Sequence, residues 1–362
     1  MQTIGIDALG ITIVGAIFVA TLLLFDVPTG ILADRWSRKN CLILSALLLA
    51  LSSFVLGRSH GLSLYIVGSV LYGLNFVLYQ GTIQAITYDT LYAEGRQDSY
   101  RKVWGRLYSF TLTGILVGSV LSGFIANHFS LRDTYFFTIV PSLLSVLILF
   151  WLVEPPSHKE AVDEHFISHA KKAIKQILSS RLLIDLSLLL MIASLLSNFQ
   201  NEYIQLYFLA LGLAPIALGV LNAAFAGAAV IGQLAAGWLP KRVDRFLPIL
   251  VATYAGFSLW HSKWGLVVFL ISVVVRNIIE NQTEAEIQDN IKSSVRATTI
   301  SVVNFASNAI TIPLSILFGW VVRDYGAFRG FQMVALIGAI YLIYEVIFSP
   351  NKLLAEEKRG WL

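Results

Sequence analysis

Apolar residues fill the chain in eleven long runs that are separated by short polar segments. Most runs hold about 20 residues, the length that an α-helix needs to cross a hydrocarbon core of about 30 Å. The pattern therefore predicts an all-α polytopic membrane protein with eleven transmembrane helices. The runs cover residues 8–28, 41–58, 63–91, 103–127, 132–152, 182–211, 214–239, 246–262, 264–286, 297–322 and 327–348.

The first run leads into the segment DVPTGILADRWSRK at residues 26–39. Asp26 is the first charge after a long uncharged stretch, and Pro28 and Gly30 both weaken helical structure. We therefore expect the first helix to end near Pro28 and the following residues to form a turn at the membrane surface.

Composition supports the membrane class and excludes several others. Charged residues make up 13% of the 362 residues, whereas soluble domains hold roughly 25%. The single cysteine, Cys41, excludes a disulfide within the chain. We find no nucleophile elbow, phosphate-binding glycine loop or zinc-ligand cluster. The sequence therefore predicts neither an enzyme nor an ATP-driven pump, with no metal, no cofactor and no nucleic-acid partner.

Lysine and arginine are distributed unequally between the two sides of this topology. If residues 34–39 face the cytoplasm and the helices alternate, cytoplasmic segments hold twenty of the 26 cations and outer turns hold five. Such an excess is typical of cytoplasmic loops. The pattern predicts a multi-pass protein of the cell or inner membrane whose N-terminus lies outside and whose C-terminus is cytoplasmic.

One long polar segment, residues 154–181, interrupts the series of apolar runs. We expect it to be a cytoplasmic linker with an amphipathic interfacial helix at its centre. It separates an N-terminal bundle of five spans at 1–153 from a C-terminal bundle of six spans at 182–349. Residues 350–362 then form a cytoplasmic tail.

The two halves also repeat. Gly30–Arg38 aligns without gaps to Gly237–Arg245, and each segment leads from an apolar run into a short turn. The first copy follows the first run of its half, but the second copy follows the second run of its half. The first half therefore lacks the counterpart of one opening helix.

The segment VPTGILADRWSRK resembles the cytoplasmic loop between the second and third helices of the major facilitator superfamily of secondary transporters. In that pattern, a glycine precedes an aspartate, a basic residue, a second glycine and two more basic residues. Ser37 stands where the second glycine is expected, and DVPTG is similar to the EVPTG of one branch, which 88–106 and 296–307 also resemble. The matching residues are Gly30, Asp34, Arg35, Arg38 and Lys39.

This resemblance covers essentially the whole chain and implies a fold of two helical bundles. The family has twelve spans, so the resemblance implies that the missing helix is the family's first, which usually lines the central cavity. Either the true start lies upstream of Met1 or the chain is a truncated copy, and the sequence leaves both open.

The resemblance also implies a role for the repeated loops as an inner gate. Asp34 would accept hydrogen bonds from helix-terminal amides or a cation, and breaking that contact would open the cytoplasmic side. The inner-gate residues are Gly30, Asp34, Arg35, Arg38, Lys39, Gly237, Arg242 and Arg245.

Four glycines in the fourth run have the spacing of a glycine pattern found in antiporters of the family. They are Gly105, Gly114, Gly118 and Gly123, while Ser119 and Ser122 replace other residues of the pattern. Small residues at this spacing let two helices approach closely. Ordinary close packing and a proton-antiport function both remain open.

Charges inside the apolar runs are candidate chemistry, because an ionisable residue at membrane depth costs several kcal/mol. Arg276 lies about 18 Å into its run, near the midplane, and Glu280 follows one turn later on the same face. The pair is either a substrate or proton site, or an internal salt bridge beside a wet cavity. Glu202 is either a solvated helix end or part of an outer gate.

Polar side chains also recur at helical spacing within two runs. Asn75, Gln80 and Gln84 form a stripe in the third run, and Asn304 and Asn308 lie four residues apart in the tenth. Each set either lines a transport path or forms hydrogen bonds between helices.

The leading hypothesis is a secondary transporter that moves a small solute by alternating access. The resemblance favours proton-coupled efflux by a monomer in the bilayer, with protons as the coupling ion. The alternative is a truncated or non-transporting membrane protein, such as a sensor. The sequence does not identify the solute.

Overall fold

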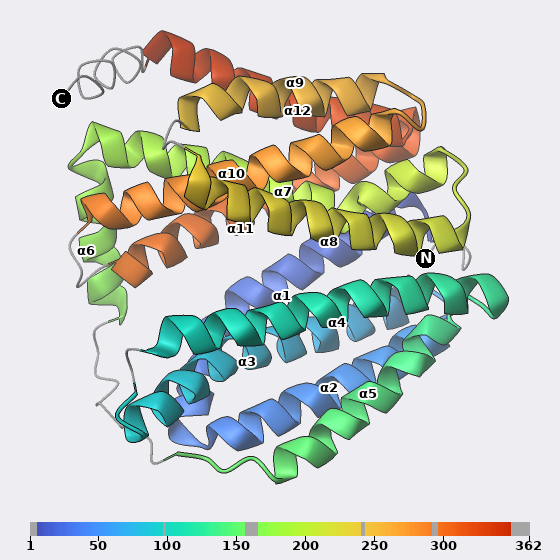
Figure 1. Ribbon diagram of the computed structural model, residues 1–362. Coiled ribbons are helices and arrows are strands. Elements are labelled where there is room, and N and C mark those ends of the chain that lie inside the picture. The colour runs from blue at the N-terminus through green and yellow to red at the C-terminus, as the bar shows by residue number, and fades with distance from the viewer. Residues whose placement is uncertain (1–5, 97–98, 156–165, 240–242, 292–295, 349–362) are drawn as a thin grey trace. The chain divides into compact units, whose positions relative to one another are not determined.

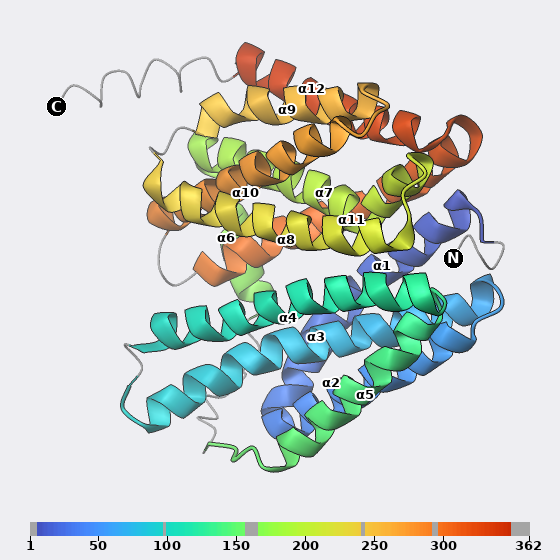
Figure 2. The ribbon, with the colours of Figure 1, turned by 45° about the vertical axis from the view of Figure 1, so that its right-hand side comes forward.

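The computed structural model describes residues 6–96, 99–155, 166–239, 243–291 and 296–348. Within these ranges the chain forms α-helices and no strand (Figures 1 and 2). The helices are α1 (Ala8–Arg35), α2 (Arg38–Arg58), α3 (Leu62–Ala93), α4 (Tyr100–His128), α5 (Asp133–Phe150), α6 (Phe166–Leu178), α7 (Arg181–Ala210), α8 (Pro215–Trp238), α9 (Val243–Leu259), α10 (Gly265–Asn290), α11 (Arg296–Tyr325) and α12 (Ala327–Phe348).

Among the described residues, ten helices are long and apolar enough to cross a membrane, and the apolar helix α9 is shorter. These eleven helices overlap the eleven predicted runs one for one. The prediction of an all-α polytopic membrane protein is therefore confirmed. The helix α6 lies within the polar segment 154–181, where an amphipathic helix is expected.

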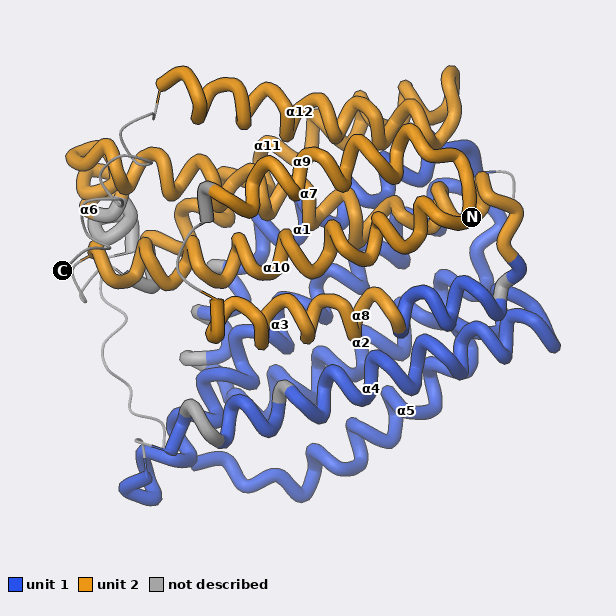
Figure 3. The backbone as a smooth tube through the Cα atoms, turned by 45° about the horizontal axis from the view of Figure 1, so that its top comes forward, with its two compact units in different colours: residues 1–163, 214–223 blue, residues 164–213, 224–362 orange. Residues whose placement is uncertain are grey.

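The chain divides into two compact units (Figure 3). Unit 1 comprises residues 1–163 and 214–223, and unit 2 comprises residues 164–213 and 224–362. The predicted tail at 350–362 lies outside the described residues.

In unit 1, α2 packs between α3 and α5, and α1 packs on α3. Small residues on α2 and α3 allow the close approach. A Cβ added at Gly57 would lie 2.8 Å from the Phe136 ring of α5. The Ser52 hydroxyl of α2 donates a 2.8 Å hydrogen bond to the backbone carbonyl of Gly68 on α3. Close packing and interhelical hydrogen bonds are the main sources of helix association in a bilayer.

In unit 2, α7 packs against α10, α11 and α12. Two buried tyrosines tie α7 to α9, because the Tyr207 hydroxyl donates to the Phe257 carbonyl and the Tyr254 hydroxyl donates to the Leu196 carbonyl, both at 2.8 Å. Fully buried aromatic rings fill the space between α7, α11 and α12: Phe199, Phe318 and Phe331.

The first helix does not end near Pro28, so that prediction is wrong. The helix α1 continues through Pro28 and Gly30 to Arg35. Proline lacks the N–H that would bond to the fourth preceding carbonyl. One residue later, the Thr29 hydroxyl donates to the Phe25 carbonyl at 2.7 Å and the helical bonding continues. Proline is tolerated in membrane proteins inside helices because side chains, neighbouring helices and local adjustments can satisfy the freed backbone.

Polar residues of α4 are satisfied within their own helix. The hydroxyls of Ser109, Thr111 and Thr113 donate to carbonyl oxygens one turn earlier, at 2.8 to 3.2 Å. All three side chains are exposed, on a helix of which little is buried. Bonding to the preceding turn is the usual way in which serine and threonine are accommodated in an apolar environment.

Candidate functional site

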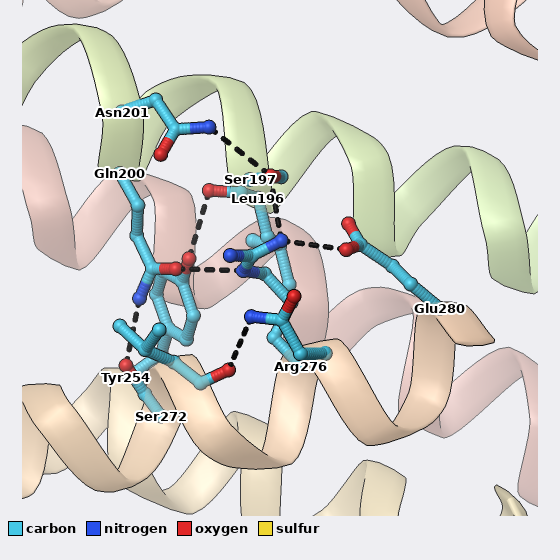
Figure 4. Close-up of polar contacts among 10 residues, drawn as sticks. Leu196, Ser197, Gln200, Asn201, Tyr254, Ser272, Arg276 and Glu280 are labelled. Carbon is cyan, nitrogen blue, oxygen red and sulfur yellow. Dashed lines mark hydrogen bonds and ion pairs between the residues drawn. The ribbon is translucent and has the colours of Figure 1, made fainter. Parts of the chain in front are cut away.

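A polar cluster in unit 2 joins α7 to α10, and we call it the α7–α10 cluster. It consists of Ser197 and Gln200 on α7 and of Ser272, Arg276 and Glu280 on α10. The three α10 residues are four positions apart and therefore share one face of the helix. Figure 4 shows that Ser197 and Gln200 reach from α7 toward the Arg276 guanidinium.

The Arg276 guanidinium makes three hydrogen bonds in this cluster. It donates to the Glu280 carboxylate at 2.7 Å, to the Ser197 hydroxyl at 2.6 Å and to the Gln200 side-chain carbonyl at 2.9 Å. The Gln200 amide in turn donates to the Ser272 hydroxyl at 2.7 Å. Because every partner is placed to accept or donate, a charge inside a membrane span is both neutralised and hydrogen-bonded.

The two charges of the cluster differ in accessibility. The Arg276 side chain is 4% exposed, whereas the Glu280 side chain is 22% exposed. The carboxylate is therefore the more accessible of the two charges. The Arg276 guanidinium is held by three hydrogen-bond acceptors.

Three other predicted polar residues of unit 2 lie on α7 or α11. The Asn198 amide donates to the Asn308 side-chain carbonyl of α11 at 3.1 Å and to the Thr311 hydroxyl at 3.3 Å. This is a hydrogen bond between helices. Asn304 and Glu202 are exposed on α11 and α7.

The predicted stripe of the third run lies along α3 in unit 1. Gln80 and Gln84 are exposed, and Asn75 is half-buried. Val77 and Leu78 of the same helix are buried. The exposed amides give α3 a polar face in an otherwise apolar helix.

A second polar cluster forms in unit 1 where α2 begins, and we call it the α2-start cluster. The Ser37 hydroxyl accepts from the Asn40 amide at 3.1 Å and caps the helix. The Glu154 carboxylate, just after α5, accepts from the Ser37 hydroxyl and from the Arg38 amide, the latter at 2.6 Å.

Charged side chains extend this cluster to α3 and α5. The Arg38 guanidinium forms an ion pair with Asp89 near the end of α3. The Lys39 ammonium donates to the Phe150 carbonyl at the end of α5, at 2.7 Å. The start of α2 is thus bonded to the ends of two neighbouring helices. Ser37 fits the position where a glycine is expected because it serves as the helix cap.

The other predicted gate residues are placed as follows. Gly30 lies within α1 and Gly237 lies near the end of α8, and a Cβ added at either would meet no atom within 4 Å. Arg245 is exposed on α9. The side chains of Asp34 and Arg35, and all of Arg242, lie outside the described residues.

A family model for the Major Facilitator Superfamily matches residues 1–315. The chain belongs to the major facilitator superfamily. This confirms the resemblance of its loop sequence and the prediction of a transporter rather than an enzyme.

This superfamily chain is also similar to curated proteins over part of its length. It is 27% identical over 159 residues to an uncharacterised transporter of Buchnera aphidicola, a match that covers 44% of the chain and 39% of the relative. It is 25% identical over 251 residues to the multidrug resistance protein MdtG of Salmonella choleraesuis, covering 65% of the chain and 57% of the relative. The matches thus span about half the length of these relatives or less.

Solved structures of superfamily transporters share the fold. The nucleoside transporter NupG superposes with a TM-score of 0.69 at 17% identity, covering 95% of this chain and 90% of that one. A D-xylose–proton symporter superposes with a TM-score of 0.71 at 13% identity, covering 93% of this chain and 86% of that one. At these identities the likeness extends to the fold alone.

The four glycines of α4 that resemble the superfamily's antiporter pattern differ in their surroundings. A Cβ added at Gly123 would lie 3.0 Å from the Gly219 Cα atom, so two backbones approach closely there. Nothing lies within 4 Å of the corresponding point at Gly105, Gly114 or Gly118.

Several residues of the two clusters carry no local sequence signal. Ser197, Gln200 and Ser272 meet Arg276 only through the packing of α7 on α10. Asp89 and Glu154 meet Arg38 across the ends of three helices. The one available signal is that Asp89 and Glu154 are acids at the ends of apolar runs. Across the described ranges, no group of three His, Cys, Asp or Glu residues is arranged to hold a metal.

Proposed function

We propose that this superfamily member is a secondary transporter that exports a small solute by alternating access, in exchange for protons. Membership of the superfamily supports transport, and the relative named as a multidrug resistance protein supports efflux. The observation that carries the proposal is the ion pair of Arg276 and Glu280 inside a membrane span. Such pairs are expensive in a bilayer and typically mark a substrate or proton path.

In this proposal, Glu280 is the carboxylate that exchanges a proton and Arg276 is the fixed charge that tunes its affinity. Protonation of Glu280 would release its hydrogen bond to Arg276, while Ser197 and Gln200 still hold the guanidinium. Protonation of Glu280 thus changes one contact, its hydrogen bond to Arg276. Such a pair is suited to coupling proton movement to solute movement.

Further residues would line the path or control access to it. We assign the path-lining role to exposed or half-buried polar side chains: Asn75, Gln80, Gln84, Glu202, Asn304 and Asn308. The α2-start cluster, together with Asp34, Arg35, Gly237, Arg242 and Arg245, would form the inner gate. The small glycines of α4, at residues 105, 114, 118 and 123, would serve helix packing. The protein would act as a monomer with a cytoplasmic C-terminus.

Transport by the purified full chain in proteoliposomes tests the proposal. A pH gradient should drive uptake of a test panel of solutes, with a pH-sensitive dye reporting proton movement in the opposite direction. Glu280→Gln should abolish the coupling, because a neutral amide cannot exchange the proton. The matched control is Glu286→Gln, the same change near the end of the same helix.

The outcomes separate the two candidate functions. Unchanged coupling in Glu280→Gln would remove Glu280 from the mechanism. Solute binding without translocation in the unaltered chain would instead support a sensor.

Asp34→Asn should slow transport without reducing expression. An amide keeps the size of the carboxylate but loses its charge, so a latch that depends on an anion weakens. The measurement is the initial rate of gradient-driven uptake at equal protein content. A normal rate in this variant would leave the loop with the role of a membrane anchor only.

A further inference from the structure

The helix α6 exposes a face that combines lysines with apolar residues. Lys171, Ile174, Lys175 and Leu178 follow at intervals of three, one and three residues, so they share one side of the helix. All four are exposed, with Ile174 at 44% and Leu178 at 67%. Together with Ser179 they line a shallow, open depression.

A neighbouring side of α6 packs against other helices of unit 2. Ile177 packs on a buried cluster formed by residues from the start of α7, the end of α10 and the start of α11. The helix is thus fixed at one end of the bundle by one side, and within the part of the chain that the structure describes the lysine-bearing face is exposed.

The position of α6 matches that of a helix at a membrane surface. Only two residues separate its end at Leu178 from the start of the spanning helix α7 at Arg181. Figure 1 shows α6 running crosswise to α7. A helix at the end of a spanning bundle and crosswise to it lies along the interface of the bilayer.

The charge of this region has one sign. From Phe166 to Ile184 the sequence holds four lysines and arginines and no acidic residue. Lys171, Lys172 and Lys175 are all exposed, so their charge is open to an anion. Exposed apolar residues between cations are typical of helices that insert their side chains among lipid headgroups while the ammonium groups remain at the phosphate level.

We propose that α6 binds an anionic phospholipid of the surrounding leaflet. Lys171 and Lys175 hold the headgroup phosphate, and Ile174 and Leu178 contact the upper part of the acyl chains. The site differs from the α7–α10 cluster and does not depend on the transported solute. The lipid composition of the membrane would therefore determine whether a lipid is bound to this segment between the two bundles.

A probe at position 178 tests this site in the intact protein. Leu178→Cys is labelled with an environment-sensitive fluorophore. Cys41 is fully buried and stays unlabelled. In nanodiscs of phosphatidylcholine, added phosphatidylglycerol should shift the probe to an apolar environment. Near an anionic surface each lysine changes affinity about fivefold. Lys171→Gln with Lys175→Gln should therefore raise the required phosphatidylglycerol fraction by roughly tenfold or more.

Matched variants and a label-free measurement make the test decisive. Lys171→Arg with Lys175→Arg should keep the response, and Lys263→Gln in another turn should not affect it. Native mass spectrometry of the unlabelled chain should find phosphatidylglycerol retained by the unaltered protein and lost from the double glutamine variant. A probe response that ignores phosphatidylglycerol, or one that free inorganic phosphate abolishes, would overturn the lipid site.

Discussion

Gln200 is wholly buried in α7, and both ends of its side-chain amide are engaged, by Arg276 on one side and by Ser272 on the other. The sequence alone predicts the pairing of Arg276 with Glu280, because residues four apart share a helix face. It does not predict Gln200, whose partners lie more than seventy positions away. Contacts within one helix follow from spacing, whereas contacts between helices follow from packing.

The same difference separates two parts of the α2-start cluster. Ser37 is recognisable as a possible helix cap from its place before an apolar run. That Arg38 pairs with Asp89 and that Glu154 accepts from two donors depends on the arrangement of three helix ends.

At the scale of single residues, we predict a strong energetic coupling between Arg276 and Glu280. Glu280→Gln leaves the buried Arg276 charge without its ionic partner, which should cost about 3–5 kcal/mol of unfolding free energy. Arg276→Gln leaves the partly exposed Glu280 carboxylate unpaired and should cost less. The double variant should lose clearly less unfolding free energy than the two single variants together. Reversible unfolding of the four proteins in detergent micelles gives this double-mutant cycle.

The exposed pair of Arg323 and Asp324 is the control for this cycle. Their side chains are 39% and 35% exposed, so Arg323→Gln should change stability by at most about 1 kcal/mol. Additive losses at Arg276 and Glu280 would contradict the coupling.

At the scale of helices, the apolar runs predict where the helices lie because the bilayer sets one length for all of them. The runs mislead at Pro28, since α1 continues past it to Arg35. Proline removes one backbone hydrogen bond from α1 without ending it, as is tolerated in membrane proteins. The apolar runs also do not predict which helices pack against one another.

Two glycines of α8 show how specific these contacts are. A Cβ added at Gly232 would lie 2.5 Å from the Val274 carbonyl oxygen of α10, whereas one added at Gly227 would meet nothing within 4 Å. We predict that Gly232→Val separates α8 from α10 and lowers the unfolding free energy by about 1–3 kcal/mol. Gly227→Val is the matched control on the same helix and should be nearly neutral. Equal stability of the two variants would argue against this contact.

At the scale of the whole molecule, charge and hydropathy identify the class of protein, and the family match confirms it. The distribution of 26 lysines and arginines predicts the orientation. The sequence does not predict the identity of the solute, because specificity depends on which polar groups converge from separate helices. The sequence therefore predicts the fold better than it predicts the chemistry.

Reporter fusions at the two ends of α12 test the orientation. Alkaline phosphatase, which is active only outside the cytoplasm, should be active when fused after Gly326 and inactive when fused after Phe348. Both fusions share the same preceding helices, so they differ only by one membrane crossing. The reverse pattern of activity would show that the cations lie on the outer side.

The hydroxyls of α4 have a consequence for how the chain discriminates among molecules. Ser109, Thr111 and Thr113 have committed their protons to carbonyls of their own helix, so they offer neighbours only acceptor lone pairs. A count of polar residues therefore overstates the hydrogen-bond donors that α4 offers to a solute. A mutational scan for donors on this helix can omit these three residues.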